Sequence, residues 1–145
     1  MPPLKRHDDL KPLSRDHHHA LLLCWRVRRD LAERADLDQV LLECHEFFKI
    51  HIAPHFTVEE EAVFPVLGNE HPLVQRALSE HRRLVRLFSE TKDPLSVLSR
   101  IEDELDAHIR FEERTLFPEV QRLASPAHLH RIAEVHGAHG PVSKE

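Results

Sequence analysis

The sequence predicts an all-α protein, an antiparallel up-down-up-down four-helix bundle with a short C-terminal fifth helix. The chain has only 3 Gly, no Tyr and 31% charged residues, whereas a β-sandwich needs turn glycines and aromatic side chains. Apolar residues recur every three or four positions between helix start and stop signals. The connections between the predicted helices are short, so neighbouring helices are expected to run antiparallel.

Capping residues set the bounds of the predicted helices, such as Asp36, Asp93 and Ser125 at helix starts. The five helices are expected at about residues 12–31, 36–67, 72–90, 93–124 and 125–137. A chain of 145 residues is expected to form one domain. The predicted domain is residues 1–145, with the bundle at about 12–124 and the C-terminal helix and tail at about 125–145.

Proline and glycine residues punctuate the longer helical patterns. Pro54 and Pro118 fall inside the second and fourth patterns, and we expect them to kink these helices. Pro65 either kinks or ends the second helix, and Gly68 with Asn69 is expected to close it.

Composition and charge exclude several classes of function. A formal charge of −5 and a pI near 6.3 do not fit a nucleic-acid-binding protein. The longest apolar run, residues 20–25, is too short to span a membrane, and no secretion signal is recognised. Cys24 and Cys44 form no CxxC motif or disulfide framework, which fits a reducing compartment. We therefore expect a cytoplasmic protein with neither nucleic-acid nor membrane partners.

Histidine is unusually frequent, with 14 copies in 145 residues, and several of them lie in or beside a repeated phrase. "HFTVEEEAVFP" begins at His55 and "HIRFEERTLFP" at His108, and both place Glu at +4 and +5, Phe at +9 and Pro at +10. Upstream of each phrase, "DHHHAL" around His17 matches "EHRRLV" around His81. The chain therefore resembles two αα-hairpins, which are expected to pack about a pseudo-twofold axis. The repeated Phe residues indicate a shared fold and not a shared chemistry.

Four His and two Glu of these repeats fall on helix faces that must be buried. The six are His17, His55, Glu59, His81, His108 and Glu112. A buried carboxylate is costly unless it is paired or coordinates a metal ion. Facing His-x-x-x-Glu pairs with two single His predict a metal site in the bundle core, and bridging carboxylates favour two ions over one. Imidazole and carboxylate ligands suit iron, with zinc or manganese as alternatives.

Several other sites of known chemistry are missing from the sequence. Ferritin-like di-iron bundles use Glu-x-x-His, which does not occur here. The chain also has no His-Glu-x-x-His, no Gly-rich phosphate loop and no nucleophile elbow. No catalytic residue is assigned, and the sequence leaves open whether the protein is an enzyme.

The doubled H-x-x-x-E-E-x-x-x-F-P phrase resembles the hemerythrin-like family, the HHE cation-binding domain, over roughly residues 12–124. The resemblance implies an antiparallel four-helix bundle around two iron ions, Fe2+ or Fe3+, joined by an oxo or hydroxo bridge. It implies terminal ligands at His17, His55, His81 and His108, and bridging carboxylates at Glu59 and Glu112.

The chain departs from the oxygen-carrying members of that family. Those proteins have an extra His on the third helix, one turn from the first, where this chain has Ala77 and Val85. Their fourth helix carries His-x-x-x-x-Asp, where this chain has His-x-x-x-Glu. The pattern is closer to relatives linked to iron-centre repair, iron sensing or nitric oxide handling. These departures argue against reversible oxygen carriage, but they do not affect the prediction that the protein binds metal.

Other residues are candidates for additional or indirect roles. His18 and its neighbour His19 compete with His17, which the apolar stripe favours. His51, one turn before His55, is a fifth imidazole ligand, a hydrogen-bond partner of a ligand, or a partly exposed residue at the bundle mouth. Glu60 and Glu113 either hydrogen-bond to a ligating His or form a solvated face.

The C-terminal segment holds a further group of histidines, at His128, His130, His136 and His139. This group is either a second, weaker metal site or a metal-responsive tail, or it is the exposed face of an amphipathic helix. We favour the exposed face.

Taken together with the resemblance to the hemerythrin-like family, the residues predict a protein that binds, senses or reacts with a small diatomic or peroxide ligand at a carboxylate-bridged di-iron centre. Dioxygen, peroxide and nitric oxide all fit this description. The alternatives are an iron storage or donor module and a structural, zinc-stabilised bundle. The sequence identifies no protein partner, and it is compatible with a monomer or a homodimer.

Overall fold

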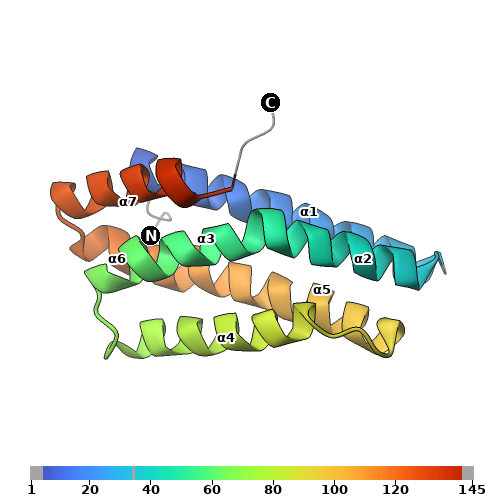
Figure 1. The fold of residues 1–145 in the computed structure, drawn as a ribbon. Coiled ribbons are helices and arrows are strands. Elements are labelled where there is room, and N and C mark those ends of the chain that lie inside the picture. Colours follow the sequence, from blue (N-terminus) through green and yellow to red (C-terminus); the bar gives the residue numbers. More distant parts are fainter. Residues whose placement is uncertain (1–4, 34, 142–145) are drawn as a thin grey trace.

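The computed structural model describes residues 5–33 and 35–141, and this part of the chain is helical without any strand (Figure 1). Residues 1–4, 34 and 142–145 of the predicted domain lie outside it. The elements are η1 (Asp8–Leu10), α1 (Lys11–Ala32), α2 (Leu37–Phe47), η2 (Phe48–Ile52), α3 (Ala53–Val58), η3 (Glu59–Val63), η4 (Phe64–Val66), α4 (Pro72–Phe88), α5 (Pro94–Phe111), η5 (Glu112–Leu116), α6 (Phe117–Leu123) and α7 (Pro126–His139). The all-α prediction is confirmed.

The elements join into four long helical runs and one shorter helix. Helix α1 is the first run, α2 to η4 form the second, α4 is the third, and α5 to α6 form the fourth. Figure 1 shows these runs side by side, with α7 lying against α1 and α3. Within the described ranges, no helix combines the length and the apolar composition needed to cross a membrane.

The expected capping residues begin the helices at which they were placed. The Asp36 carboxylate accepts a hydrogen bond from the backbone N–H of Gln39, and Asp93 does the same for Ser96. Ser125 and His128 form a reciprocal capping box at the start of α7. Each cap satisfies an N–H group that has no partner within its helix.

Three π-helical segments, η2, η3 and η5, interrupt the long runs, and each ends two residues before a proline. A proline has no N–H to donate and crowds the preceding turn, so an α-helix cannot pass it unchanged. In each segment the residue before the proline donates to the carbonyl five positions back; in η3, Phe64 donates to Glu59. The repeated Glu-x-x-x-x-Phe-Pro therefore encodes a π-turn that starts at Glu59 in one half and at Glu112 in the other.

The second run closes where the sequence indicated. Pro65 lies in the single 3-10 turn η4, and Gly68 follows with φ of 89°, a left-handed conformation that favours glycine. The N–H of Gly68 donates to the carbonyl of Phe64 and satisfies one of the last acceptors of the run.

The apolar core forms two clusters, one toward each end of the bundle. The six buried polar residues predicted as ligands lie along the helices between these clusters. The spacing of Val74, Leu78, His81, Val85 and Phe88 predicts a buried stripe on the third helix, and this prediction was wrong for Val85, which is 44% exposed while Leu84 is buried. Of the two residues four positions from His81, Ala77 is fully buried and lies on the inner face of α4, whereas Val85 does not.

Candidate metal centre

The six residues that the sequence singled out lie together in the interior of the bundle. Among the described residues, they are also the polar side chains classed as buried, each with 4% or less of its surface exposed. They come from the four long runs: His17 from α1, His55 and Glu59 from α3 and η3, His81 from α4, and His108 and Glu112 from α5 and η5.

The two carboxylates each divide their oxygens between two pairs of imidazoles. Glu59 Oε2 lies 3.1 Å from His55 Nε2, while its Oε1 lies 3.1 Å from His81 Nε2. Glu112 Oε1 lies 2.9 Å from His17 Nε2, while its Oε2 lies 3.3 Å from His108 Nε2. Both carboxylates therefore face both imidazole pairs.

This arrangement forms two groups of four ligand atoms that share the two carboxylates. Within each group all ligand atoms lie within 4.8 Å of one another. The first group is His17, His55, Glu59 and Glu112, and the second is Glu59, His81, His108 and Glu112.

In the part of the chain that the structure describes, most of the candidate ligand atoms in these two groups have no hydrogen-bond partner. All four oxygens of Glu59 and Glu112, and Nε2 of His81 and of His108, are buried and have no hydrogen-bond partner among the described residues. The nearby imidazole nitrogens lie at ion-pair distance without hydrogen-bond geometry. Such atoms are costly in a core unless a cation binds them. The donor set of imidazoles and carboxylates fits a divalent or trivalent transition-metal ion.

One nitrogen–nitrogen distance supports this fit. Nε2 of His17 and Nε2 of His55 lie 3.0 Å apart in a buried position. Two ligands at right angles on one ion, with bonds of about 2.1 Å to each nitrogen, are spaced by about 3 Å. The pair is therefore already spaced as neighbouring ligands of a single ion.

Every imidazole of the centre contacts a carboxylate through its other nitrogen. The Nδ1 contacts are His17 to Glu113 at 2.8 Å, His55 to Asp16 at 2.9 Å, His81 to Glu60 at 2.8 Å, and His108 to Glu80 at 2.7 Å. An ionised carboxylate only accepts, so Nδ1 carries the proton and donates. The Nε2 atoms, which face Glu59 and Glu112, are then unprotonated and could bind a metal ion.

Two of these carboxylates, Asp16 and Glu80, were missed as functional residues. Each directly precedes the single His of its hairpin, and the match between "DHHHAL" and "EHRRLV" contains both. The signal was therefore present in the repeat. Asp16 on the first run contacts His55 on the second, and Glu80 on the third run contacts His108 on the fourth. These partners can be identified only once the packing of the helices is known.

The repeated phenylalanines also contact the centre. The Phe117 ring stacks on His17 with ring centroids 5.2 Å apart, and Phe64 lies 5.4 Å from the His81 ring. Both phenylalanines are fully buried. They restrict the rotation of the two single histidines, a role that the sequence analysis had not given them.

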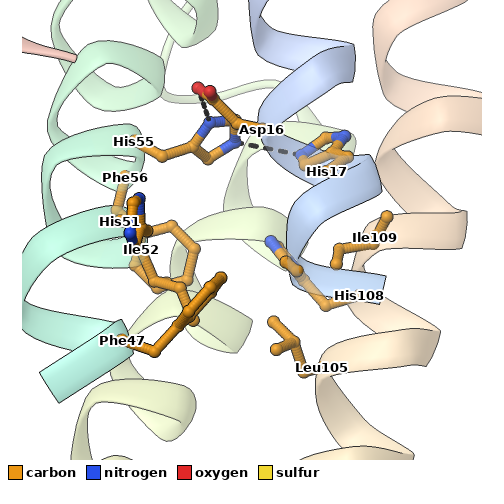
Figure 2. A pocket seen from close by; sticks show the side chains of 11 residues that line it. Asp16, His17, Phe47, His51, Ile52, His55, Phe56, Leu105, His108 and Ile109 are labelled. Carbon is orange, nitrogen blue, oxygen red and sulfur yellow. Dashed lines mark hydrogen bonds and ion pairs between the residues drawn. The ribbon is translucent and has the colours of Figure 1, made fainter. Parts of the chain in front are cut away.

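A small cavity opens beside the centre on the side of His17, His55 and His108. Its volume is about 20 Å³, close to what one water molecule requires. Figure 2 shows Phe47 and His51 on the opposite side of this cavity from His108. His51 packs against the ring of Phe47, with centroids 4.7 Å apart, and it lies outside both four-atom groups.

The remaining candidate histidines are not among the six buried polar residues. His18 and His19 are exposed, with their rings near each other on the outer face of α1. In the C-terminal helix, His128 caps the helix and His130 pairs with Glu134 at the surface. His136 differs, because its Nε2 lies 2.8 Å from Asp16. Among the described residues, none of these histidines belongs to a four-atom group.

In the metal-free protein, protons balance the charge of the carboxylates. Burial lowers the pKa of His108, but the charge of Glu112 and the contacts with Glu112 and Glu80 outweigh it, and the pKa rises to about 9. For His17 and His81, burial likewise lowers the pKa, but the neighbouring carboxylates outweigh burial and raise it well above 6.5. Burial raises the pKa of Glu112, but His108 and its other neighbours bring it well below the usual range.

The metal-free protein is expected to lose stability as the pH rises from about 6.5 to about 9.5. The folded-state pKa of His108 lies above its ordinary value of 6.5. Protonated His108 therefore contributes its full stabilisation to the folded state below pH 6.5, and this stabilisation is lost as the pH passes about 9. For His108 alone, 1.36 kcal/mol per pKa unit gives about 3 kcal/mol. Urea unfolding of chelator-treated protein at both pH values measures the loss.

A His130→Gln variant, altered at an exposed position of α7, should show the same loss, whereas His108→Gln should show a smaller one. Equal stability of the wild-type metal-free protein at both pH values would mean that the buried imidazoles are neutral throughout.

Fold and site together define a class: a helical protein with a buried His–Glu centre suited to binding cations. Comparison with known families agrees with that description. The model of the hemerythrin HHE cation-binding domain matches residues 8–96, and the chain belongs to this family. The matched range includes His17, His55, Glu59 and His81 and ends before the second repeated phrase. No curated protein and no solved structure matches the chain.

Proposed function

We propose that this protein binds two iron ions between its four helical runs and uses them to react with a small oxidant. One observation carries this proposal: both oxygens of Glu59 and of Glu112 are buried and divided between two imidazole pairs. A single ion would use only one side of each carboxylate. The proposal includes a single domain with the antiparallel up-down-up-down order of the four runs.

In this proposal, His17 and His55 bind one ion, and His81 and His108 bind the other. Glu59 and Glu112 would help to hold both ions, since each has one oxygen toward each imidazole pair. Each position then receives four ligand atoms from the protein. Six ligands are common for iron, so room remains for a small molecule at each position, as reactive metal sites require.

The protein admits only a small molecule to this centre. The adjacent cavity of about 20 Å³ has room for little more than one water-sized molecule. A larger hollow of about 380 Å³ shares Asp16, Phe47 and His51 with the small cavity. These shared residues lie between the hollow and the centre, which makes them the natural point of entry for dioxygen, peroxide or nitric oxide.

The bound iron ions would supply the electrons that reduce the oxidant. The protein's own contribution is to hold the ligands still. Each Nδ1–H donates to a carboxylate, which fixes the ring orientation and makes Nε2 a stronger ligand. Ile52, Leu105 and Ile109 give the small cavity apolar walls that limit the access of bulk water.

The reduced, iron-loaded protein is expected to be oxidised by air without reverting. On the inner face of α4, the residue one turn from His81 is Ala77, which cannot saturate one ion selectively. Both positions therefore stay open to the oxidant, and electrons from both can be used. Stopped-flow mixing with oxygenated buffer, followed by removal of oxygen under argon, measures whether the absorption spectrum returns to that of the reduced form.

A spectrum that returns to the reduced form under argon would contradict this expectation and indicate reversible oxygen binding. His51→Ala then tests whether His51, which lines the cavity and was a sequence candidate for a fifth imidazole ligand, is the cause of the reversible binding. His18→Ala, altered at an exposed position of α1, serves as the control. A protein that carries zinc, or that shows no charge-transfer absorption in either state, would favour the structural-bundle alternative.

A further inference from the structure

The C-terminal helix reaches the metal centre through one side chain. His136 Nε2 donates a hydrogen bond to Asp16 Oδ2 over 2.8 Å. The same oxygen accepts the Nδ1–H of His55 over 2.9 Å. The side chains of His136 and Asp16 are 15% and 14% exposed, so this contact is largely screened from water. A continuous chain of contacts therefore runs from α7 through Asp16 to His55.

Helix α7 is held in place by apolar packing next to this contact. Leu129, Ile132 and Val135 of α7 are buried in the same apolar cluster as Leu10 and Val58. His136 directly follows Val135, so docking of the helix sets its position. The helix packs against α1 and α3, the helices that carry Asp16 and His55 (Figure 1).

The other half of the centre is built differently. Glu80, which holds His108, is supported by Arg76 from one turn earlier in the same helix, at 3.0 Å. That support does not depend on a separate element. The carboxylate of Asp16, in contrast, depends on a residue 120 positions along the chain. The two halves are thus alike in their ligand atoms and unlike in what positions them.

We propose that His136 is a positioning residue for the His17–His55 half of the centre, and that it couples the docking of α7 to metal binding there. The inference rests on the proposed function in taking His17 and His55 as ligands. By fixing Asp16, His136 fixes the ring of His55 with Nε2 facing His17.

The coupling acts in both directions. If a docked α7 improves metal binding at this position, then metal at this position must favour the docked helix by the same factor. Metal loss is therefore expected to loosen α7 locally, while the second position, supported by Arg76, leaves α7 unaffected. Helix α7, residues 126–139, lies beyond the range 8–96 that the family model matches.

The test compares His136→Leu, which removes the donor, with His136→Gln, which keeps an N–H near the position of Nε2. Titration of the metal-free full-length protein with Co2+ should show two bound ions in the wild type. In His136→Leu one of the two should bind roughly tenfold more weakly, at the low end of the loss expected for partners of metal ligands. His136→Gln should recover most of this loss.

Hydrogen exchange of the amides in α7 provides a second readout. Exchange should slow when Co2+ binds the wild type, and this difference should disappear in His136→Leu. Two controls separate positioning from general damage. His130→Leu changes an exposed residue of the same helix, and Arg76→Gln should weaken the other ion without altering exchange in α7.

Unchanged affinity for both ions in His136→Leu would overturn the inference. Equal weakening of both ions would overturn it as well, since that result indicates a structural role. If the wild type binds no Co2+, the proposed function fails. The imidazole NMR signals of the metal-free protein then test separately whether His136 positions His55. The Nδ1–H signal of His55 should then be visible in the wild type and in His136→Gln but lost in His136→Leu; an unchanged signal in all three overturns the positioning role.

Discussion

Replacing Glu59 with alanine is expected to remove both metal ions from the protein, and Glu112→Ala is expected to do the same. Each of these carboxylates faces both imidazole pairs, with one oxygen toward each. Removing either one leaves both positions short of a ligand and of a negative charge. Metal analysis of the purified variants measures the number of ions that each retains.

The matched control is Glu61→Ala, two positions after Glu59 on the exposed surface. It should keep the full metal content. Glu59→Gln and Glu112→Gln preserve the side-chain volume, and circular dichroism checks that all variants are folded. Loss of one ion in each variant would argue against shared carboxylates, and full retention would remove these residues from the site.

Removing the metal from the wild type should lower its melting temperature by roughly 10 °C. Two ionised carboxylates and four imidazoles are buried together, and the metal satisfies atoms that otherwise lack a hydrogen-bond partner among the described residues. A ligand present at about a thousandfold above its Kd stabilises the folded state by about 4 kcal/mol. For a chain of this size, 1 kcal/mol corresponds to roughly 2–4 °C in Tm.

Calorimetry with and without a chelator measures this shift. The Glu59→Ala/Glu112→Ala double variant is the control, since the chelator should leave its melting temperature unchanged. Identical melting of metal-free and metal-loaded wild type would show that the buried polar residues are satisfied without metal, and the burial argument would fail.

The repeated phrase allowed the buried polar layer to be predicted, because helical periodicity places His55 and Glu59 on one face in the same way as His108 and Glu112. Capping residues predicted the helix starts and Gly68 the close of the second run, because their effects are local, whereas the last helix continues past its expected end at Gly137 to His139. Both kinds of signal act within a few residues along the chain.

The π-turns were not predicted, although their cause is in the sequence. The prolines were expected to kink or end the helices. In the structure, the turn before each of these prolines is a π-turn, in which the hydrogen bond spans five residues and not four. Val85 was misplaced because the buried face of α4 is centred to one side of His81: Ala77 and Leu84 lie on that side and are buried, while Val85 lies on the other.

The contacts of Asp16 and His136 could not be read from sequence spacing. They join α1, α3 and α7, and they depend on how these helices pack. His136 was placed on an exposed face because the C-terminal segment has many histidines and a weak apolar pattern. Only the docked position of α7 distinguishes it from His130.

The central claim is that one chain holds two metal ions that share Glu59 and Glu112. The most direct measurement is the iron-to-protein ratio of the full-length chain, purified without a metal-affinity column from cells supplied with iron. We expect two iron ions per chain. A ratio of one, or a protein that retains no iron after purification under these conditions, would contradict the two-ion centre.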